Sequence, residues 1–486
     1  MTINISDLQP KAVWENFAKI CSIPHPSGKE KQLAEFIKEF GTKLGLESII
    51  DDVNNVIIRK PATPGMENRK YVTFQNHIDM VPQKNNDIVH DFEKNPIQAF
   101  VDNGWVKAKG TTLGADNGIG AAIAMAVLQA KTIKHGPIEA LFTVEEETTM
   151  AGAFALKPNI LKGDILINID SEADDTLWVG CAGGLYTDAI FKYTETQVPV
   201  SSMALKISIS GLKGGHSGCD IHLGRGNANK LMVRFLWEQK EKCHLRLANI
   251  FGGTVYNAIN RESFAIVTIP QNKKEELLRA IVQFEFTIKN EIANVDPNFH
   301  ITAEMVEMPK ALIDEKTQNA FLNSAHGCPD GVIGMSKDIP DLVETSTNLG
   351  KIFLENKEIH VGTLQRSSVD SLLDNTGNTV FSIFTLAGAE IKFFGKYPGW
   401  KPNTKSQILQ VMKPIYKNKF GKEAFVKAIH AGLECGLIGA IYPKMDMISL
   451  GPNIVKNHSP DECTEIKSVE RIWELLLEVL ANIPTK

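Results

Sequence analysis

A histidine and an aspartate stand two positions apart, at His77 and Asp79, where the β-prone residues 71–76 end. This pattern predicts a strand that presents polar side chains at its C-terminal end. In open α/β sheets ligands bind at that end, because the loops that leave the strands line a crevice there. Asp79 could bond to one nitrogen of His77 and make the other a better metal ligand. A His-x-Asp pair alone is more often a surface coincidence, so the hypothesis depends on the rest of the chain.

Further carboxylates stand at the borders of other predicted elements. Asp116 comes just before residues 119–130, which are apolar throughout and predict a buried helix. Taken alone, Asp116 is more simply explained as the N-cap of that helix. The predicted strand 138–144, however, runs directly into Glu145, Glu146 and Glu147. Neighbouring carboxylates repel and raise one another's pKa, so three acids at a strand end indicate a bound cation.

Two more predicted strands lead to the same kind of residue. Residues 164–169 form an apolar run that ends at Asp170, and the strand 445–450 is followed by a loop that contains His458. The strand-end loops therefore offer an inventory typical of a two-metal hydrolase: His77, Asp116, Glu146, Glu147, Asp170 and His458. A purely structural explanation is much weaker for all six together than for any one of them.

The elements that carry these residues alternate in the pattern of a parallel α/β sheet. Helices are predicted over 7–21 and from Ser27, where Ser27 and Glu30 fit a capping box. From about residue 185 the pattern changes to that of an inserted α+β domain, and helix–strand alternation returns after 394. We predict an α/β fold with a mixed, largely parallel sheet flanked by helices, divided into a catalytic domain (1–184 and 395–486) and an inserted domain (185–394).

Composition narrows the class of partner. The chain has 486 residues, 43% hydrophobic and 22% charged, which predicts a two-domain globular protein. A net charge of −5 without a basic block gives no sign of nucleic acid or of a membrane surface and favours a small-molecule partner. The first residues lack a signal-peptide pattern and no run of apolar residues is long enough to span a membrane, so we predict a cytoplasmic protein.

The cysteines exclude one kind of metal site. They are seven in number, scattered and without a Cys-x-x-Cys pair, so neither a disulfide framework nor a thiolate zinc site is indicated. A metal would have to be held by His, Asp and Glu. That ligand set suits a hydrolytic zinc or manganese centre.

Five short motifs resemble the co-catalytic zinc peptidases, a family that includes aminoacylase and the carnosinases. The resemblance covers essentially the whole chain. The motifs occupy residues 74–82, 112–118, 146–147, 168–170 and 458–460. Within the family, four other stretches look most like its bacterial dipeptidases: residues 59–62, 82–86, 212–218 and 430–436.

The resemblance implies a role for each residue of the inventory. Asp116 would bridge two metals, one completed by His77 and Asp170 and the other by Glu147 and His458. Glu146 would be the general base that activates a metal-bridged water, and Asp79 would assist as a further catalytic residue behind His77. The implied cofactor is two Zn²⁺ per subunit, with Mn²⁺ or Co²⁺ as substitutes. The sequence does not fix the native metal, because all three accept this ligand set.

The resemblance also implies substrate contacts from the inserted domain, which would serve as a lid and dimerisation domain. His216 would stabilise the oxyanion, and Asn257, Arg366, Gly432 and His216 would bind the substrate. Arg366 alone is more simply explained as a solvated strand charge. With the resemblance, a carboxylate clamp is the better interpretation, since guanidinium binds carboxylates bidentately. In this family a partner subunit supplies the histidine, so we expect a homodimer.

One departure from the family concerns the triple acid. The family has a glycine shortly after its Glu-Glu pair, where this chain has residues 148–150, and Glu145 adds an acid that leaves the register open. Aligning on Met150 keeps Glu146 as the base and Glu147 as the ligand.

The implied function is a metal-dependent dipeptidase of broad specificity that prefers Xaa-His, including carnosine-like substrates. An N-acyl amino acid amidohydrolase or a carboxypeptidase-like relative is the alternative, because it would share every metal ligand. A non-catalytic binding protein on a peptidase fold is a third hypothesis, against which the retention of Glu146 and all five ligands argues. The sequence does not state how strongly a C-terminal histidine is preferred.

Overall fold

The computed structural model describes residues 4–486, which divide into two compact units. The first unit comprises the residues up to 180 together with 402–428 and 433–486, and the second comprises 181–401 and 429–432. The predicted insertion, 185–394, lies within the second unit. Among residues 4–486, no helix combines the length and the apolar character needed to cross a bilayer.

The first unit is built on an eight-stranded sheet. Its strands are, in spatial order, β1 (Glu47–Ile50), β2 (Val56–Lys60), β6 (Ile138–Thr143), β3 (Val72–His77), β7 (Ile165–Asn168), β23 (Asp446–Ser449), β8 (Thr176–Cys181) and β22 (Phe425–Ile429). The four central strands, β6, β3, β7 and β23, are parallel to one another, while β1, β2 and β8 pair antiparallel with their neighbours. The mixed, largely parallel sheet predicted from the sequence is therefore confirmed.

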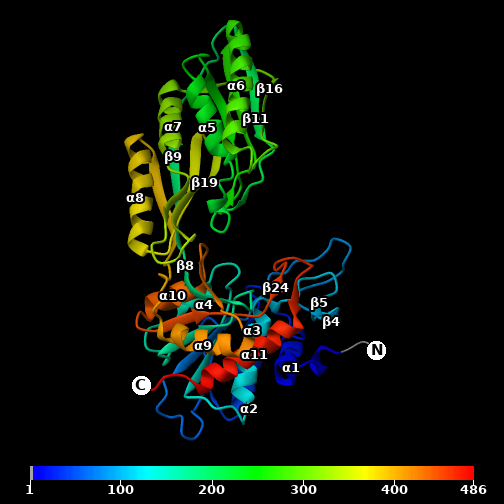
Figure 1. The fold of residues 1–486 in the computed structure, drawn as a ribbon. Coiled ribbons are helices and arrows are strands. Elements are labelled where there is room, and N and C mark those ends of the chain that lie inside the picture. Colours follow the sequence, from blue (N-terminus) through cyan, green and yellow to red (C-terminus); the bar gives the residue numbers. More distant parts are fainter. Residues whose placement is uncertain (1–3) are drawn as a thin grey trace. The chain divides into compact units, whose positions relative to one another are not determined.

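Helices accompany this sheet, and Figure 1 shows α9 and α11 next to each other within the unit. They are η1 (Ile5–Asp7), α1 (Lys11–Cys21), α2 (Lys31–Lys43), α3 (Ala115–Gln129), α4 (Ala151–Ala155), α9 (Gln407–Phe420), α10 (Glu434–Ile441) and α11 (Ile466–Ala481). α3 is buried along nearly its whole length, as its continuous apolar sequence predicts. It packs against α1 and β3, so its N-terminus lies near the end of β3 that carries His77.

Close packing brings α3 to the end of β7. A Cβ atom placed on Gly120 would lie 2.2 Å from the carbonyl oxygen of Ile169, so only glycine allows this approach. The side-chain amide of Asn117, at the start of α3, donates to the same carbonyl at 2.5 Å. Asp116 and Asp170 are thereby held on neighbouring elements.

A smaller sheet of four strands completes the first unit. Its order is β24 (Ile454–Val455), β25 (Cys463–Glu465), β5 (Trp105–Ala108) and β4 (Ala99–Asp102). β24 and β25 flank the loop that contains His458, and β25 pairs with β5. The small sheet thus fixes both ends of that loop.

The second unit contains a five-stranded and a four-stranded antiparallel sheet. The first has the order β18 (Gly331–Met335), β19 (Val343–Glu355), β20 (Glu358–Ser367), β9 (Gly183–Lys192) and β21 (Glu390–Tyr397), and the second has the order β13 (Arg246–Phe251), β15 (Ser263–Pro270), β11 (Ser202–Ser210) and β16 (His300–Met305). Two-stranded sheets pair β10 (Glu195–Thr196) with β17 (Leu312–Ile313) and β12 (Gly215–His216) with β14 (Ala258–Ile259).

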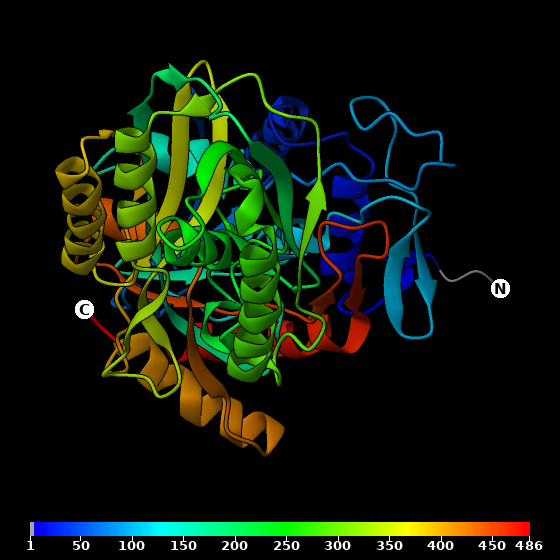
Figure 2. The same ribbon diagram turned by 90° about the horizontal axis from the view of Figure 1, so that it is seen from above.

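The helices of the second unit cover these sheets and close its core. They are η2 (Ile221–Leu223), α5 (Ala228–Gln239), η3 (Gln271–Lys273), α6 (Lys274–Ile292), α7 (Glu315–Gly327) and α8 (Asp370–Leu386). Figures 1 and 2 show α8 along the five-stranded sheet, where it contacts β9, β20 and β21, while α5 and α6 lie on the four-stranded sheet. This is the α+β character predicted for the insertion.

One local prediction is wrong. The capping box of Ser27 and Glu30 does not form: α2 begins at Lys31, and its N-cap residue, Glu30, makes no side-chain capping bond. The hydroxyl of Ser27 donates instead to Oδ2 of Asp79 at 2.7 Å, and Oε1 of Glu30 accepts from the N–H groups of Gly28 and Glu145. Bonds to the distant residues Asp79 and Glu145 have replaced the reciprocal bonds of the box.

Candidate active site

The site is assembled at the carboxyl ends of the four parallel strands. His77 is the last residue of β3, Glu146 and Glu147 follow β6, Asp170 follows β7, and His458 lies in the loop after β23. Asp116 joins them from the start of α3. Parallel strands bring their carboxyl ends to one edge of a sheet, so residues far apart in the chain meet there.

Asp116 contacts both histidines, one with each carboxylate oxygen. Its Oδ1 lies 3.2 Å from Nε2 of His77, and its Oδ2 lies 3.3 Å from Nε2 of His458. Nε2 of His77 is also 3.3 Å from Oδ1 of Asp170, and Nε2 of His458 is 2.9 Å from Oε2 of Glu147. The cluster therefore has two halves that share Asp116.

These side chains have the composition and spacing of metal ligands. Three groups each offer ligand atoms within 4.8 Å of one another: His77 with Asp116 and Asp170, His77 with Glu146 and Glu147, and Asp116 with Glu147 and His458. Among residues 4–486, Oε1 of Glu147 and Oδ1 of Asp170 are buried without a hydrogen-bond partner, although Oδ1 of Asp170 lies 3.3 Å from Nε2 of His77. Buried carboxylate oxygens of this kind in a group of His, Asp and Glu fit divalent cations.

Charge governs the protonation of the cluster. Burial alone would lower the pKa of His77, but Asp170, Asp116 and Asp79 raise it well above its ordinary value. Hydrogen bonds to Asp116 and Glu147 raise the pKa of His458 to about 11. Burial also raises the pKa of Glu146 well above its ordinary value, and the charges of Asp170, Glu434 and Glu147 add to this effect. Without a cation, the carboxylates favour the protonated form of both imidazoles.

Asp79 organises the site from behind His77. Its Oδ1 lies 3.3 Å from Nδ1 of His77, which leaves Nε2 directed at the carboxylates. The same carboxylate accepts from the backbone N–H groups of Glu146 at 2.9 Å and Glu147 at 3.1 Å. Asp79 therefore fixes the imidazole and the start of the acidic loop together.

Glu462, which the sequence analysis did not identify, holds the loop that presents Asp116. Its carboxylate accepts four backbone N–H groups, those of Leu113, Gly114, Ala115 and Asp116, at 2.8 to 3.2 Å. It is 2% exposed and lies more than 340 positions from its partners along the chain. No local pattern could have revealed this contact.

The three acids 145–147 differ in their contacts. Glu146 and Glu147 belong to the candidate ligand groups, whereas Oε2 of Glu145 accepts a hydrogen bond from Thr149 at 3.0 Å. Met150, which aligns with a glycine of the resembling family, has a φ of 53°. That value lies in the left-handed region that favours glycine, which supports the alignment.

His216 lies in the second unit, in a turn that fixes its tautomer. Its Nδ1 accepts hydrogen bonds from the N–H groups of Gly218 at 3.2 Å and Cys219 at 3.0 Å. The proton of the neutral ring is therefore on Nε2, which can donate. Burial and the charge of Arg366 lower the pKa of His216 to about 4, so the ring is neutral at pH 7.

The other predicted substrate residues also belong to the second unit. Arg366 on β20 is 4% exposed, and its guanidinium donates to the hydroxyl of Tyr397 at 2.9 Å. Its Nε is buried and has no hydrogen-bond partner in the part of the chain that the structure describes. The carbonyl of Asn257 accepts from the N–H of Ser217, next to His216. Gly432 follows Ala431, whose carbonyl accepts from the N–H of Ala182. Arg366 is thus a buried cation rather than a solvated strand charge.

Comparison with known proteins gives close relatives. The model of the family described as Peptidase family M20/M25/M40 matches residues 73–482. The cytosol non-specific dipeptidase of Escherichia coli (strain K12) is 46% identical over 482 residues, which cover 99% of each chain. The crystal structure of aminoacylhistidine dipeptidase from Vibrio alginolyticus has a TM-score of 0.94 at 45% identity and covers 100% of this chain and 99% of that one. Aminopeptidase PepT from Bacillus cereus shares the fold, with a TM-score of 0.62 at 16% identity over 98% of this chain and 99% of that one.

Metal binding to the metal-free protein should release protons even at pH 8. The raised pKa values mean that the pairing of His77 and His458 with carboxylates stabilises the metal-free protein fully below pH 6.5, and that His458 loses this contribution only as the pH rises through about 11. A metal must therefore displace about one proton from each imidazole, and its affinity falls as the pH falls. Calorimetric zinc titrations in buffers of different ionisation enthalpy measure the release. The His458→Gln variant should release about one proton fewer when zinc binds. If the unsubstituted protein releases no protons, both imidazoles are already neutral in the metal-free protein.

Proposed function

The chain belongs to Peptidase family M20/M25/M40, and we propose that it is a metal-dependent dipeptidase of broad specificity that prefers Xaa-His substrates, carnosine-like dipeptides included. One observation carries the proposal: five metal-ligand side chains and Glu146 meet at the carboxyl ends of β3, β6, β7 and β23. The names of the relatives from Escherichia coli and Vibrio alginolyticus support the choice of dipeptides and of a C-terminal histidine.

Membership of this metallopeptidase family implies binding of divalent metal. In our proposal Asp116 bridges two ions, His77 and Asp170 complete one site, and Glu147 and His458 complete the other. The contacts of Asp116 with both histidines support this division. We propose two Zn²⁺ per subunit, with Mn²⁺ or Co²⁺ able to replace them, because this ligand set accepts all three.

Bound metals would polarise the peptide carbonyl and lower the pKa of water. Glu146 takes the proton of the attacking water on its carboxylate as the C–O bond forms and the carbonyl oxygen becomes an oxyanion. It then passes this proton to the amine nitrogen as the C–N bond of the tetrahedral adduct breaks. Its pKa is raised by burial and by Asp170, Glu434 and Glu147, which suits a group that must hold the proton between these two transfers. Asp79 keeps His77 oriented and anchors the backbone of Glu146.

His216 and Arg366 supply the substrate contacts in this proposal. The neutral His216, with its proton on Nε2, donates to the oxyanion, and Asn257 and Gly432 help to hold the substrate. Arg366 binds the C-terminal carboxylate, since its Nε has no hydrogen-bond partner within residues 4–486 and a guanidinium matches a carboxylate in two-pronged geometry. An N-acyl amino acid amidohydrolase or a carboxypeptidase-like enzyme would use the same clamp and metals.

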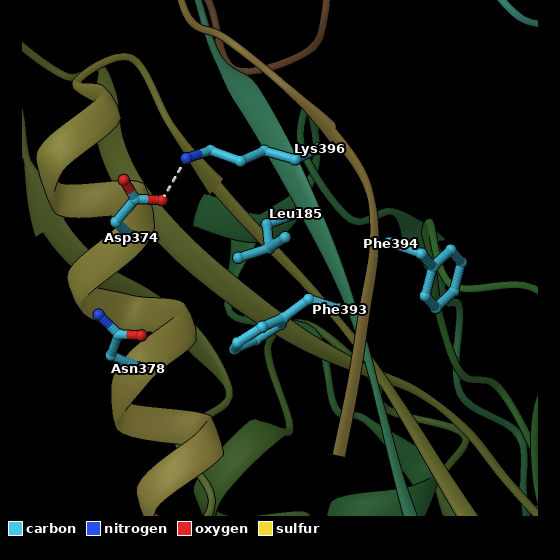
Figure 3. A pocket seen from close by; sticks show the side chains of 6 residues that line it. All are labelled: Leu185, Asp374, Asn378, Phe393, Phe394 and Lys396. Atoms are coloured by element: carbon cyan, nitrogen blue, oxygen red, sulfur yellow. Dashed lines mark hydrogen bonds and ion pairs between the residues drawn. The ribbon is translucent and has the colours of Figure 1, made fainter.

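We propose that the protein is a homodimer and that His216 acts in the active site of a partner subunit. The edge of the five-stranded sheet supports dimerisation: β21 is an edge strand, and its Phe393 and Phe394 are each 42% exposed. Figure 3 shows these rings on opposite sides of β21, with Lys396 paired to Asp374 of α8. α8 adds exposed Phe381. An apolar edge strand is a natural surface for a second copy across a two-fold axis.

The cytoplasm is the proposed location. The support for it is the name of the Escherichia coli relative, which is that of a cytosol enzyme. A catalytically silent binding protein remains the third hypothesis; the presence of Glu146 beside the ligand groups argues against it.

Substrate preference separates the dipeptidase from its alternatives. We expect hydrolysis of Xaa-His and Xaa-Gly dipeptides, with a higher kcat/KM for Xaa-His, and little hydrolysis of longer peptides or N-acyl amino acids. A panel of these compounds, assayed with zinc, measures the preference. Faster hydrolysis of N-acyl amino acids than of any dipeptide would favour the amidohydrolase.

Substitution of the two adjacent acids should have different effects. Glu146→Ala should lower kcat by about 10²- to 10⁴-fold while metal content stays near normal, because a general base transfers protons and does not coordinate. Glu147→Ala should lose metal as well as activity. Elemental analysis and steady-state kinetics on both variants test the assignment. Glu145→Ala is the neighbouring control, which should keep both its metal content and its activity. Metal loss in Glu146→Ala alone would reverse the two roles.

Mixing two inactive variants should restore activity if His216 serves a partner's site. His216→Ala should lower kcat by about 10²- to 10³-fold, the usual effect of removing one oxyanion donor. A mixture of Glu146→Ala and His216→Ala chains then contains heterodimers with one intact composite site. Dipeptide assays after subunit exchange, verified with tagged chains, measure the recovery. Exchange without recovery would place His216 in the site of its own chain or outside catalysis.

A further inference from the structure

Glu434 is a buried carboxyl in the first unit that the proposed mechanism does not use. It is the first residue of α10 and is 0% exposed. Its Oε2 accepts two hydrogen bonds, from Nε2 of Gln75 at 2.5 Å and from Oγ1 of Thr143 at 2.7 Å. Its Oε1 is buried and has no hydrogen-bond partner among residues 4–486. All of its side-chain hydrogen bonds are therefore made to these two residues.

The bonds to Glu434 are the end of a longer chain of side chains. Nδ2 of Asn168 donates to Oε1 of Gln75 at 2.6 Å, and Oγ of Ser449 donates to Oδ1 of Asn168 at 2.5 Å. Oγ of Ser171 lies 2.6 Å from Oγ of Ser449. Because the hydroxyl proton of Ser449 is directed to Asn168, Ser171 is the donor in that last bond. Every donor in the chain thus points toward the carboxylate.

The chain runs across the sheet just below the metal-ligand cluster. Gln75 on β3 precedes His77 by two positions, and Asn168 on β7 precedes Asp170 by two positions. Thr143 ends β6 and Ser449 ends β23, the strands that lead to Glu147 and His458. Gln75, Thr143, Asn168 and Ser449 are each 0% exposed. One hydrogen-bonded row therefore joins the ends of all four ligand-bearing strands.

The acceptor at the end of the row sets the direction of every bond in it. An ionised carboxylate only accepts, so it requires the amide nitrogen of Gln75 to face it and turns Oε1 of Gln75 toward Asn168. In the same way, Asn168 directs Nδ2 at Gln75 and therefore presents Oδ1 as the acceptor for Ser449. Backbone pairing fixes the register of the strands but not these side-chain orientations. Without the carboxylate, the side-chain amide of Gln75 could rotate by half a turn. Its Nε2 would then face Nδ2 of Asn168, and two donors would meet.

The carboxyl is kept in surroundings that disfavour its charge. Burial, followed by the charges of Asp170 and Asp79, raises the pKa of Glu434 to about 7. An apolar side chain would avoid this penalty but would leave Nε2 of Gln75 and the hydroxyl of Thr143 without this acceptor. An acid in such a place indicates a role beyond packing.

We propose that Glu434 is a positioning residue: as the terminal acceptor of this row, it fixes the spacing of the strand ends that carry His77 and Asp170 and so sets the affinity of the metal that they hold. The inference rests on the proposed function for the identity of the ligands. Partners behind metal ligands typically contribute 10- to 100-fold in metal affinity.

Two substitutions of Glu434 and a matched control test the proposal. Glu434→Ala removes the acceptor, whereas Glu434→Gln keeps an oxygen that can accept from Gln75 and Thr143. Glu139 is the control: it is also 0% exposed, lies near the opposite end of β6, and likewise accepts from β3, through Thr73 at 2.7 Å. Zinc stoichiometry and affinity are measured by chelator competition at constant pH, and folding by circular dichroism and thermal melting.

Glu434→Ala should bind one of two zinc ions about 10- to 100-fold more weakly. Glu434→Gln should recover most of that affinity, and Glu139→Ala should melt at a lower temperature with unchanged zinc affinity. Wild-type zinc affinity in folded Glu434→Ala would overturn the proposal. Two further results would overturn it. If Glu434→Gln binds zinc as weakly as Glu434→Ala, the charge of Glu434 and not the hydrogen-bonded row sets the affinity. If Glu139→Ala loses as much zinc affinity as Glu434→Ala, the effect is not specific to the row.

Ser449→Ala removes the donor to Oδ1 of Asn168, at the β23 end of the row, and leaves only a small cavity. It should weaken the same zinc ion in the same direction by a smaller factor, and an unchanged affinity would overturn the proposal even if Glu434→Ala does not fold. Unsubstituted protein that binds no zinc would instead contradict the proposed function, so the two failures are distinguishable.

Discussion

The contact of Asp116 with both histidines is the interaction around which the first unit is arranged. One carboxylate can meet His77 and His458 only if α3 starts close to the ends of β3 and β7 and the loop after β23 folds back over it. Gly120 permits the approach of α3 to Ile169, and Glu462 binds the backbone that leads into Asp116. The small sheet holds β24 and β25 on either side of His458. Each of these features helps to place a carboxylate oxygen of Asp116 against Nε2 of His77 or of His458.

The arrangement also brings several carboxylates close enough together to repel one another. Asp116, Glu146, Glu147 and Asp170 are crowded together, and the neighbouring acids Glu172 and Glu434 have their pKa raised, mainly by burial, to about 8 and about 7. Such a cluster is stable without metal only while protons occupy some of its members. Divalent cations remove the conflict, and the same charges that bind them also raise the pKa of Glu146 toward the range in which a base can return its proton.

Sequence patterns predict the parts of the molecule whose causes are local. The strand ending at His77, the buried helix after Asp116 and the strands before Glu146 and Asp170 follow from apolar runs, and the parallel order follows from their alternation. Ser27 shows the limit: its spacing to Glu30 fits a cap, yet its hydroxyl bonds Asp79. Glu462 and Glu434 were not predicted because their partners lie hundreds of positions away. Burial and direction of hydrogen bonding are tertiary properties, and no spacing in the sequence encodes them.

The position of β23 in the sheet has a consequence for biosynthesis. This strand lies between β7 and β8, although more than 260 residues separate it from either in the chain. A ribosome-bound chain that has not yet released residues 446–465 has an open gap in its central sheet, lacks His458 and Glu462, and leaves the edge of β7 unpaired. Contacts between residues so far apart in the sequence form slowly, and until they form the unpaired strand edges are exposed to aggregation. The contacts of Asp116 with both His77 and His458 therefore form late in folding, after residues 446–465 have left the ribosome.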